Sequence, residues 1–447
     1  MSLFDRIFPS HKPPQQPNIP FGRYADAYKS KSQTDIFNRS LEQFESGERL
    51  EAYRSFLTYL KDERTGDNIE WHEETEGEQT TLHFSFWQGS RRITGTANAD
   101  KVKAESRIAI ADDLQVGFLR RLMEANYSLK FCRFALTPDD ALAIKFDSHG
   151  LDGSPLKILA ALRELAIHAD KQDDLLLDEF KSLLRPAEER TYGDIDEAEK
   201  EVKFAYIRQQ IEQVSAEFEK EKPDPNQYPG AYAYLLLALA FRFDYLIKPE
   251  GFTMDVMERI HTIYFAKNDK APQAKITSIR KEFVKLLDRS KEDFFKEMYR
   301  TRSTFGINPA VGHQHIVQLI EGELPKMEWP LQHNHTALAL AVPQYIAGFA
   351  LFHYAPPQPD RDLLHLFFQI TEPKFFQDLG FRHSFVGDDG RLSKVAILKE
   401  IKQIQSRHRA EYTRFKPDVS ELDFGSEVLF AKSYLLMIRE LDLSRER

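Results

Sequence analysis

The stretch from Asp112 to Leu184 decides the fold: DDLQVGFLRRLMEANYSLKFCRFALTPDDALAIKFDSHGLDGSPLKILAALRELAIHADKQDDLLLDEFKSLL. Apolar residues three and four positions apart predict a helix in LQVGFLRRLMEAN and two more in SPLKILAALRELAIHAD and DDLLLDEFKSLL. Alternating apolar residues predict two strands between them, YSLKFCRFALT and ALAIKFDSH, joined by a Pro-Asp-Asp turn. The stretch therefore predicts a strand pair packed with helices.

Local signals refine these elements. Asp112 and Asp113 suit a helix N-terminus, and Ser154 with Pro155 suits the start of the next helix. The apolar residues of the first helix fall on one face that we expect to be buried: Leu114, Phe118, Leu119, Leu122 and Met123. The apolar phase of the first strand shifts near Cys132 and Arg133, which favours a β-bulge there.

Upstream of this stretch, two further patterns extend the domain. Residues 34–61 predict a helical hairpin broken at Ser46 and Gly47. Between Asn68 and Ile110 the apolar period falls to two, with turn-forming separators TEGE, QGS and NAD. This predicts an antiparallel meander of three or four strands with one buried face.

The first thirty residues form a proline-rich tail. Its prolines prevent regular structure: Pro9, Pro13, Pro14, Pro17 and Pro20. An apolar face on one or two helical turns before them suggests a short docking motif: Leu3, Phe4, Ile7 and Phe8. We favour the alternative, that the tail packs on its own domain, because chain termini are commonly tied down in this way.

A polar, proline-containing segment, RPAEERTYGD, marks a domain boundary near Arg185–Thr191. The rest of the chain has the helical period almost throughout, beginning with a long charged helix over 195–220. The fold class is therefore α+β: a tail (1–30), an antiparallel sheet with packed helices (31–190), and an all-α domain (191–447).

The element order over residues 34–184 is helices, strands, helix, two strands, helix. This order resembles the α/β fold of type III secretion chaperones and YbjN-type bacterial proteins, from which the paired first helices and an extra strand depart. The FGRY tail and the ADKQDDLLLDEF segment resemble a family of uncharacterised bacterial proteins. The chaperone resemblance implies binding of an extended protein segment by a homodimer.

Composition bears on the partners and the compartment. The net charge of −9 and pI of about 5.9 argue against nucleic acid and anionic lipid, which need a basic surface. The N-terminus has no secretory-signal pattern, and the most apolar run, AYAYLLLALA, falls short of the roughly 18 residues of a membrane span. We therefore expect a cytoplasmic protein. The single cysteine, Cys132, excludes an intrachain disulfide and a Cys-based zinc site.

Four histidines of the helical half are the sharpest candidates for chemistry. GHQH contains His313 and His315, and QHNH contains His333 and His335, so four imidazoles could bind zinc or another transition metal. Positions i and i+2 point apart on a helix, and the HExxH spacing is missing from both motifs. We favour histidines at helix ends and surfaces, and whether the four converge stays open.

Other motifs identify no catalytic or cofactor site. Adjacent carboxylates occur in four pairs: Asp139 and Asp140, Asp173 and Asp174, Asp196 and Glu197, and Asp388 and Asp389. The pairs at 173 and 196 are explained by helix starts. No GxGxxG, GxxxxGKS, GxxxxGKT or GxSxG motif occurs. Two arginine doublets, at 91–92 and 120–121, could pair with an acidic peptide if both reached one side of the sheet, although a solvated surface is the simpler interpretation.

The sequence thus favours a non-enzymatic protein-interaction or chaperone-like module with a protein or peptide partner, and it allows a homodimer. Antiparallel sheets offer an edge or an open face to a partner segment. The alternative is a metal-dependent enzyme or binder that uses His313, His315, His333 and His335 beside Trp329. No cofactor is predicted.

Overall fold

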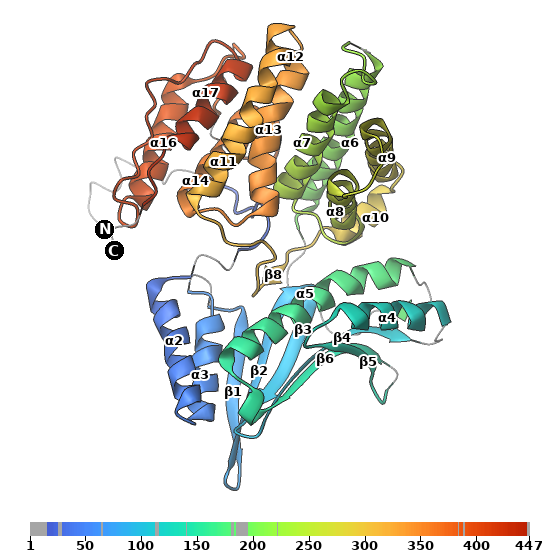
Figure 1. Ribbon diagram of the computed structural model, residues 1–447, viewed down its shortest axis with the longest axis vertical. Helices are drawn as coiled ribbons and strands as arrows, with labels where there is room; N and C mark the ends of the chain where they lie inside the picture. The colour runs from blue at the N-terminus through green and yellow to red at the C-terminus, as the bar shows by residue number, and fades with distance from the viewer. Residues whose placement is uncertain are drawn as a thin grey trace, which may run out of the picture.

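The computed structural model divides into a sheet half and a helical half (Figure 1). It describes residues 16–25, 29–63, 66–111, 116–139, 141–179, 183–184, 195–220, 222–382, 384–387 and 389–444. The predicted α+β class is confirmed, with an antiparallel sheet and packed helices followed by helices. The predicted boundary at 185–191 and the apolar turns at 3–8 lie outside the described residues.

The sheet is antiparallel, in the order β1-β2-β3-β4-β6-β5, and the predicted meander of residues 68–110 is confirmed as its first four strands. Two short strands lie off this path, β7 beside β4 and β8 beside β2. The strands are β1 Ile69–Glu76, β2 Gln79–Gly89, β3 Arg91–Ala97, β4 Lys101–Ala111, β5 Arg133–Leu136, β6 Ala141–His149, β7 Leu183–Leu184 and β8 Arg302–Ser303.

One face of the sheet is apolar and covered by helices. Along β2, the alternate residues Leu82, Phe84 and Phe86 are buried, as the period of two predicts. They share a core with residues of α3 and α5, and α5 crosses the sheet in Figure 1. The helices of this half are α2 Lys31–Glu45, α3 Arg49–Leu60, α4 Val116–Ser128 and α5 Pro155–Glu179, with the short 3-10 turn η1 Gly150–Asp152.

Two local predictions for the central stretch are wrong. The segment expected as a strand from Tyr127 begins as the last turn of α4, and strand pairing starts only at Arg133. The shift of apolar phase therefore marks a turn between helix and strand, not a β-bulge. The two helices expected after Ser154 are one helix, α5, so Asp173 and Asp174 lie within it and do not begin a helix.

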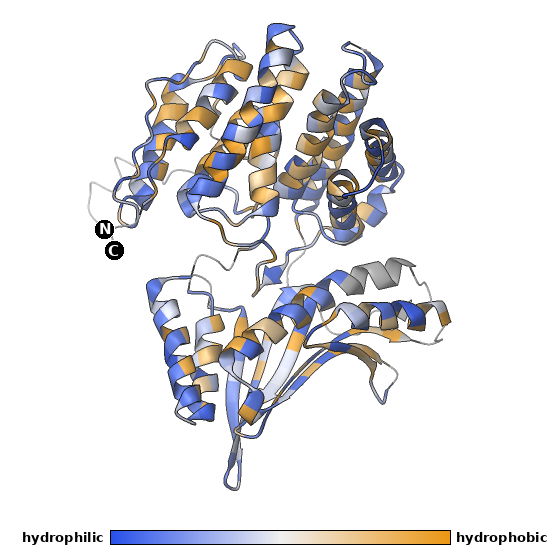
Figure 2. Cartoon of the chain, viewed as in Figure 1, coloured by the Kyte–Doolittle hydropathy of each residue, from blue (hydrophilic) through white to orange (hydrophobic). Residues whose placement is uncertain are grey.

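The helical half is built around α7 Pro229–Ile247 and α13 Thr336–His353. Both are long and apolar enough to cross a membrane by length and composition, which corrects the expectation that the run in α7 is too short. Within the most apolar windows, 83% of α7 and 72% of α13 is buried in the protein, which is typical of core helices. Figure 2 shows the apolar residues along both.

The other helices pack around this pair. They are α6 Glu197–Glu219, α8 Gly251–Phe265, α9 Pro272–Leu287, α10 Lys291–Glu297, α11 His313–Glu323, η2 Leu324–Met327, α12 Glu328–Gln332, α14 Gln358–Thr371, α15 Pro373–Asp378, α16 Lys394–His408 and α17 Glu427–Arg439. Asp196 caps α6 by accepting a hydrogen bond from the Ala198 N–H at 3.1 Å, so the predicted helix start at Asp196 and Glu197 is confirmed.

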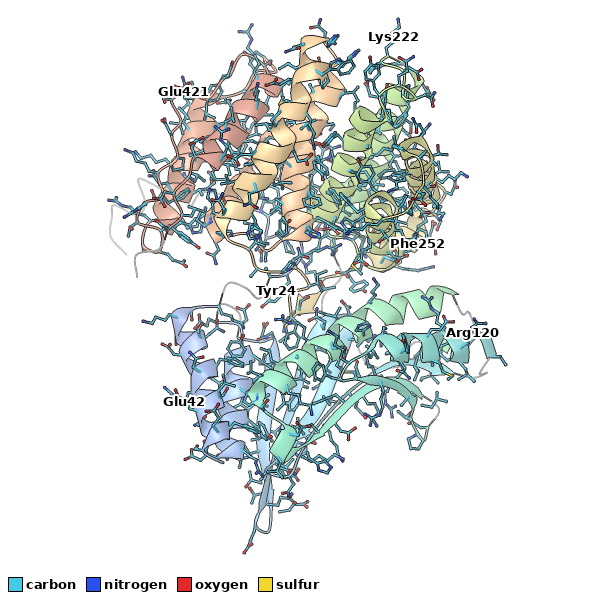
Figure 3. The ribbon with its side chains drawn as sticks, in the orientation of Figure 1. Tyr24, Glu42, Arg120, Lys222, Phe252 and Glu421 are labelled. Atoms are coloured by element: carbon cyan, nitrogen blue, oxygen red, sulfur yellow. The ribbon has the colours of Figure 1, made fainter. Side chains whose placement is uncertain are left out.

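The N-terminal segment 16–25, called the strap below, packs on the helical half. Phe21 lies among the rings of Tyr245, His365, Phe376 and Phe381, at centroid distances of 5.2–6.4 Å. The Gly22 N–H donates to the Tyr245 carbonyl at 2.8 Å. Arg23 forms three hydrogen bonds of 2.6–3.0 Å with Asp244. Figure 3 shows Tyr24, which follows, between the two halves.

In the opposite sense, residues 302–305 leave the helical half and enter the sheet half. β8 pairs with Gln88 and Gly89 at the end of β2. The Gln88 side chain donates to the Phe305 carbonyl at 3.1 Å and accepts from the Thr304 and Phe305 N–H groups. The Phe305 ring packs in the sheet core 5.5 Å from that of Phe86. Each half is thus braced by a segment distant in sequence.

Candidate functional site

The first histidine pair begins α11. His313 Nδ1 lies 2.9 and 3.0 Å from the two carboxylate oxygens of the fully buried Asp360, the third residue of α14. The ring of His315 lies 6.2 Å from that of Tyr354. His313 thus supplies the partner that the buried Asp360 carboxylate requires, and the contact joins two helices.

The second pair flanks Trp329. The rings of His333 and His335 lie 4.7 and 5.5 Å from the indole, and 6.4 Å from each other. Within the described residues, no three His, Cys, Asp or Glu side chains could share a metal ion. The contacts of these imidazoles are therefore with a carboxylate, with aromatic rings and, for His333 Nδ1, with the Trp329 carbonyl oxygen at 2.8 Å.

The adjacent carboxylates are likewise dispersed. Asp139 forms an ion pair of 2.9 Å with Arg107, and Asp196 caps α6. Asp140 and Asp388 lie outside the described residues, as do the side chains of Asp173 and Asp174. Among the described residues, no contact brings two of these carboxylates together, as an acid/base dyad would require.

The first unusual surface is on α4, which is apolar on two sides. Phe118 and Leu122 are buried against the sheet. On the other side, four apolar residues are exposed by 82, 38, 73 and 93%, and we call them the α4 stripe: Val116, Leu119, Met123 and Tyr127. Their spacing of three, four and four places them along one line of the helix. The expectation that Leu119 and Met123 belong to the buried face is therefore wrong.

Charged residues run beside the α4 stripe. Arg120 Nε donates to Glu124 Oε1 at 3.0 Å, across one helical turn. Figure 3 shows Arg120 projecting from α4 at the periphery of the molecule. The stripe thus has an apolar centre and a polar border, as at protein interfaces.

The turn after α4 is held firmly. The Glu164 carboxylate on α5 accepts hydrogen bonds from the N–H groups of Lys130, Phe131 and Cys132, at 2.8, 2.8 and 2.9 Å. Although burial raises the pKa of Glu164, these backbone donors hold it below its usual value. Cys132 is buried, as expected, and burial raises its thiol pKa. This clamp fixes the end of the α4 stripe relative to the sheet.

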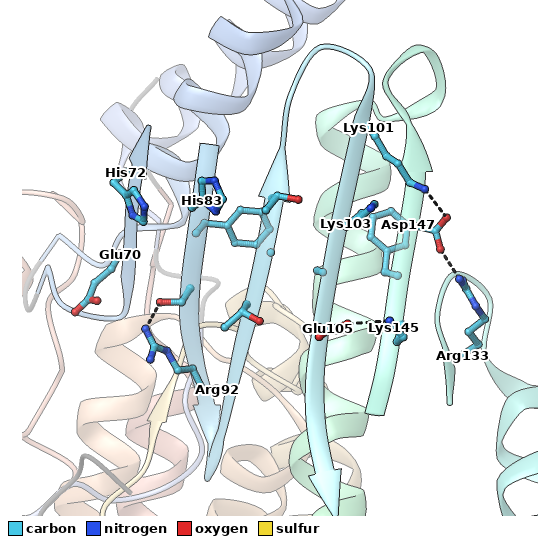
Figure 4. Close-up of a pocket in the computed structure, with 17 residues that line it drawn as sticks. Glu70, His72, His83, Arg92, Lys101, Lys103, Glu105, Arg133, Lys145 and Asp147 are labelled. Carbon is cyan, nitrogen blue, oxygen red and sulfur yellow. Dashed lines mark hydrogen bonds and ion pairs between the residues drawn. The ribbon is translucent and has the colours of Figure 1, made fainter. Parts of the chain in front are cut away.

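The second unusual surface is the polar face of the sheet, opposite α5 (Figure 4). It forms a trough of about 830 Å³ that crosses β1, β2, β3, β4, β6 and β5. Its side chains alternate with the buried ones, so Arg92 is exposed on β3 whereas Arg91 is buried. The first arginine doublet is therefore divided between the two faces.

The α4 stripe could have been predicted from the sequence, because positions 116, 119, 123 and 127 have helical spacing. It was missed because Tyr127 was assigned to a strand. To predict the trough, one would have to know the order in which the strands pair, and the sequence does not show that order. No protein-family model, curated protein or solved structure matches the chain.

Proposed function

We propose that this protein is a non-enzymatic, chaperone-like protein-interaction module whose sheet half associates with protein surfaces. The observation that carries the proposal is the exposed α4 stripe. An apolar line with a charged border is typical of a protein-binding surface. A helix of a monomer ordinarily turns only one apolar side inward and leaves the other polar.

The occupant that fits the stripe is a second copy of this chain. When two α4 helices pack antiparallel about a twofold axis midway between Leu119 and Met123, Leu119 faces Met123 of the second copy. Val116 then faces Tyr127 of the second copy. A twofold interface requires this self-complementarity, in which residue i meets j and j meets i.

The charges obey the same symmetry. Arg120 and Glu124 lie on the same side of the α4 stripe, one helical turn apart. In the antiparallel arrangement, Arg120 lies at nearly the same height as Glu124 of the second copy. Two reciprocal ion pairs between Arg120 and Glu124 can therefore border the apolar contact on one side.

The contact is of modest size. Stable interfaces bury about 800 Å² per partner, and four side chains of one short helix supply only a part of that area. Phe131 and Leu136, which are also exposed, can add to it. We therefore expect a reversible dimer with a dissociation constant on the order of micromolar.

Sedimentation equilibrium of the full chain over a range of concentrations tests the dimer. Met123→Glu should abolish it, because the substitution buries an unpaired charge in the contact. The matched control is Val395→Glu on α16, where an equally exposed valine lies far from the stripe. A wild-type chain that stays monomeric throughout, or equal effects of the two substitutions, would contradict the proposal.

A further inference from the structure

The trough on the polar face of the sheet carries more cations than anions. Its walls hold five Lys or Arg residues against three carboxylates, a surplus of two in a chain whose net charge is −9. The cations are Arg92, Lys101, Lys103, Arg133 and Lys145, and the carboxylates are Glu70, Glu105 and Asp147. All of the acidic surplus of the protein therefore lies elsewhere, and this trough is locally basic.

Ion pairs within the trough use only some of the cations (Figure 4). Asp147 pairs with both Arg133 and Lys101, the latter at 3.6 Å. Lys145 pairs with Glu105 at 2.9 Å. These pairs lie toward the β4, β6 and β5 side.

Two exposed cations on β3 and β4 have no carboxylate partner among the described residues. Arg92 donates only to the Ser85 hydroxyl, at 2.9 Å, and Lys103 has no ion pair. Thr94 and Thr96 follow Arg92 on the same face of β3, and Thr96 is paired with Lys103 in the strand register. Two hydroxyls thus lie between two unneutralised cations.

We propose that this trough binds an extended, acidic protein segment, with one carboxylate at Arg92 and another at Lys103. The inference names the partner chemistry of the interaction function proposed above and rests on it. Arg92 lies four residues from the partner of Lys103, so about 13 Å separates the cations along the strand. An extended peptide spans that distance with acidic residues about four positions apart.

The same charges favour a protein segment over a nucleic acid. A phosphate backbone binds where many cations gather without interruption. In this trough Glu70, Glu105 and Asp147 are interspersed with the cations and would repel a continuous polyanion. Discrete carboxylates separated by polar residues avoid those three positions, and the threonine hydroxyls offer them hydrogen bonds.

The test measures binding of the full chain to a fluorescent twelve-residue Ser/Thr peptide with glutamate at its fourth and eighth positions. We expect saturable binding that weakens as salt is raised. Replacing both glutamates by glutamine should weaken it at least tenfold. The double substitution Arg92→Glu and Lys103→Glu should do the same, whereas Lys281→Glu with Lys402→Glu, the same charge change on exposed helical sites, should change affinity less than twofold.

Several outcomes overturn the inference. These are no saturable binding by the wild-type chain, equal binding of the glutamine peptide, equal effects of the two double variants, or tighter binding of an oligonucleotide of equal length. Circular dichroism verifies that each variant is folded. Met123→Glu separates this inference from the dimer: peptide affinity retained by that variant supports the trough even if the α4 contact fails.

Discussion

The helical half and the sheet half differ in how far their charged groups are paired and their apolar groups are buried. In the helical half, buried charges have partners, such as Arg23 with Asp244 and His313 with Asp360, and the most apolar helices are inside. In the sheet half, apolar residues of α4 face outward and two cations of the trough have no carboxylate partner among the described residues. Groups that folding leaves without a contact are the ones available to a partner.

Because of this contrast, we expect the functional surfaces in the sheet half and not at the histidines of the helical half. Sequence reasoning directed attention to the histidines of the helical half, whose described contacts instead support packing. The α4 stripe is exposed, and Arg92 and Lys103 of the trough have no carboxylate partner among the described residues. Substitutions of buried charges in the helical half should therefore reduce stability, whereas substitutions on the α4 stripe or in the trough should reduce association with a partner.

The largest loss of stability is expected from Arg23→Ala. Asp244 is only 3% exposed and would lose all three of its hydrogen bonds from the strap. An unpaired buried charge costs about 3–5 kcal/mol, which urea unfolding can measure. The double variant Arg23→Met, Asp244→Leu should recover part of the loss. A cost below about 1 kcal/mol would mean that the strap is not integral to the helical half.

The next largest loss of stability is expected at residues 302–305, which leave the helical half and pair with β2 of the sheet. Phe305→Ala removes a ring that is 2% exposed and packs against Phe86. The cavity should cost about 3 kcal/mol. Because the ring joins the two halves, thermal unfolding should also change from one transition toward two. A single unshifted transition would contradict the role of residues 302–305 as a brace.

A smaller effect should follow pH. Burial lowers the pKa of His365, beside Phe21 of the strap, to about 4. Between pH 6.5 and 4 the unfolded chain binds a proton that the folded chain does not, so stability falls as pH is lowered through this window. The loss is at most about 3 kcal/mol. The difference between wild type and His365→Gln isolates it, and identical pH profiles for the two would rule it out.

The smallest effect on stability is expected in the trough. Arg92→Gln with Lys103→Gln should change the free energy of unfolding by less than about 0.5 kcal/mol, because exposed residues without charged partners contribute little. Chemical denaturation checks this. A larger loss would show that these cations serve the fold, which would remove the contrast with Arg23.

Much of the fold follows from local pattern. In the helical hairpin, the turn between α2 and α3 contains Gly47, whose φ of +86° suits glycine. The four-strand meander follows from alternation, as at Leu82, Phe84 and Phe86. The start of α6 follows from its capping residue Asp196. These signals act over a few residues, so the sequence displays them directly.

The errors arise where distant residues determine the structure. Glu164 bonds the N–H groups of residues 130–132, more than thirty positions earlier, and so imposes a turn where alternation suggested a strand. Phe21 and Phe305 reach partners over two hundred positions away in Tyr245 and Phe86. The trough depends on β6 pairing with β4. None of these contacts has a local signature.

The central claim, that the α4 stripe joins two copies antiparallel, is tested most directly by cysteine cross-linking. The native Cys132 is buried and should not compete. Mixing the separate variants Leu119→Cys and Met123→Cys under mild oxidation should yield a mixed disulfide-linked dimer, because those positions face each other across the contact. We expect the mixed dimer to form faster than either self-linked dimer, and Val395→Cys to give no dimer at a comparable rate. No mixed dimer, or self-linked dimers forming just as fast, would contradict it.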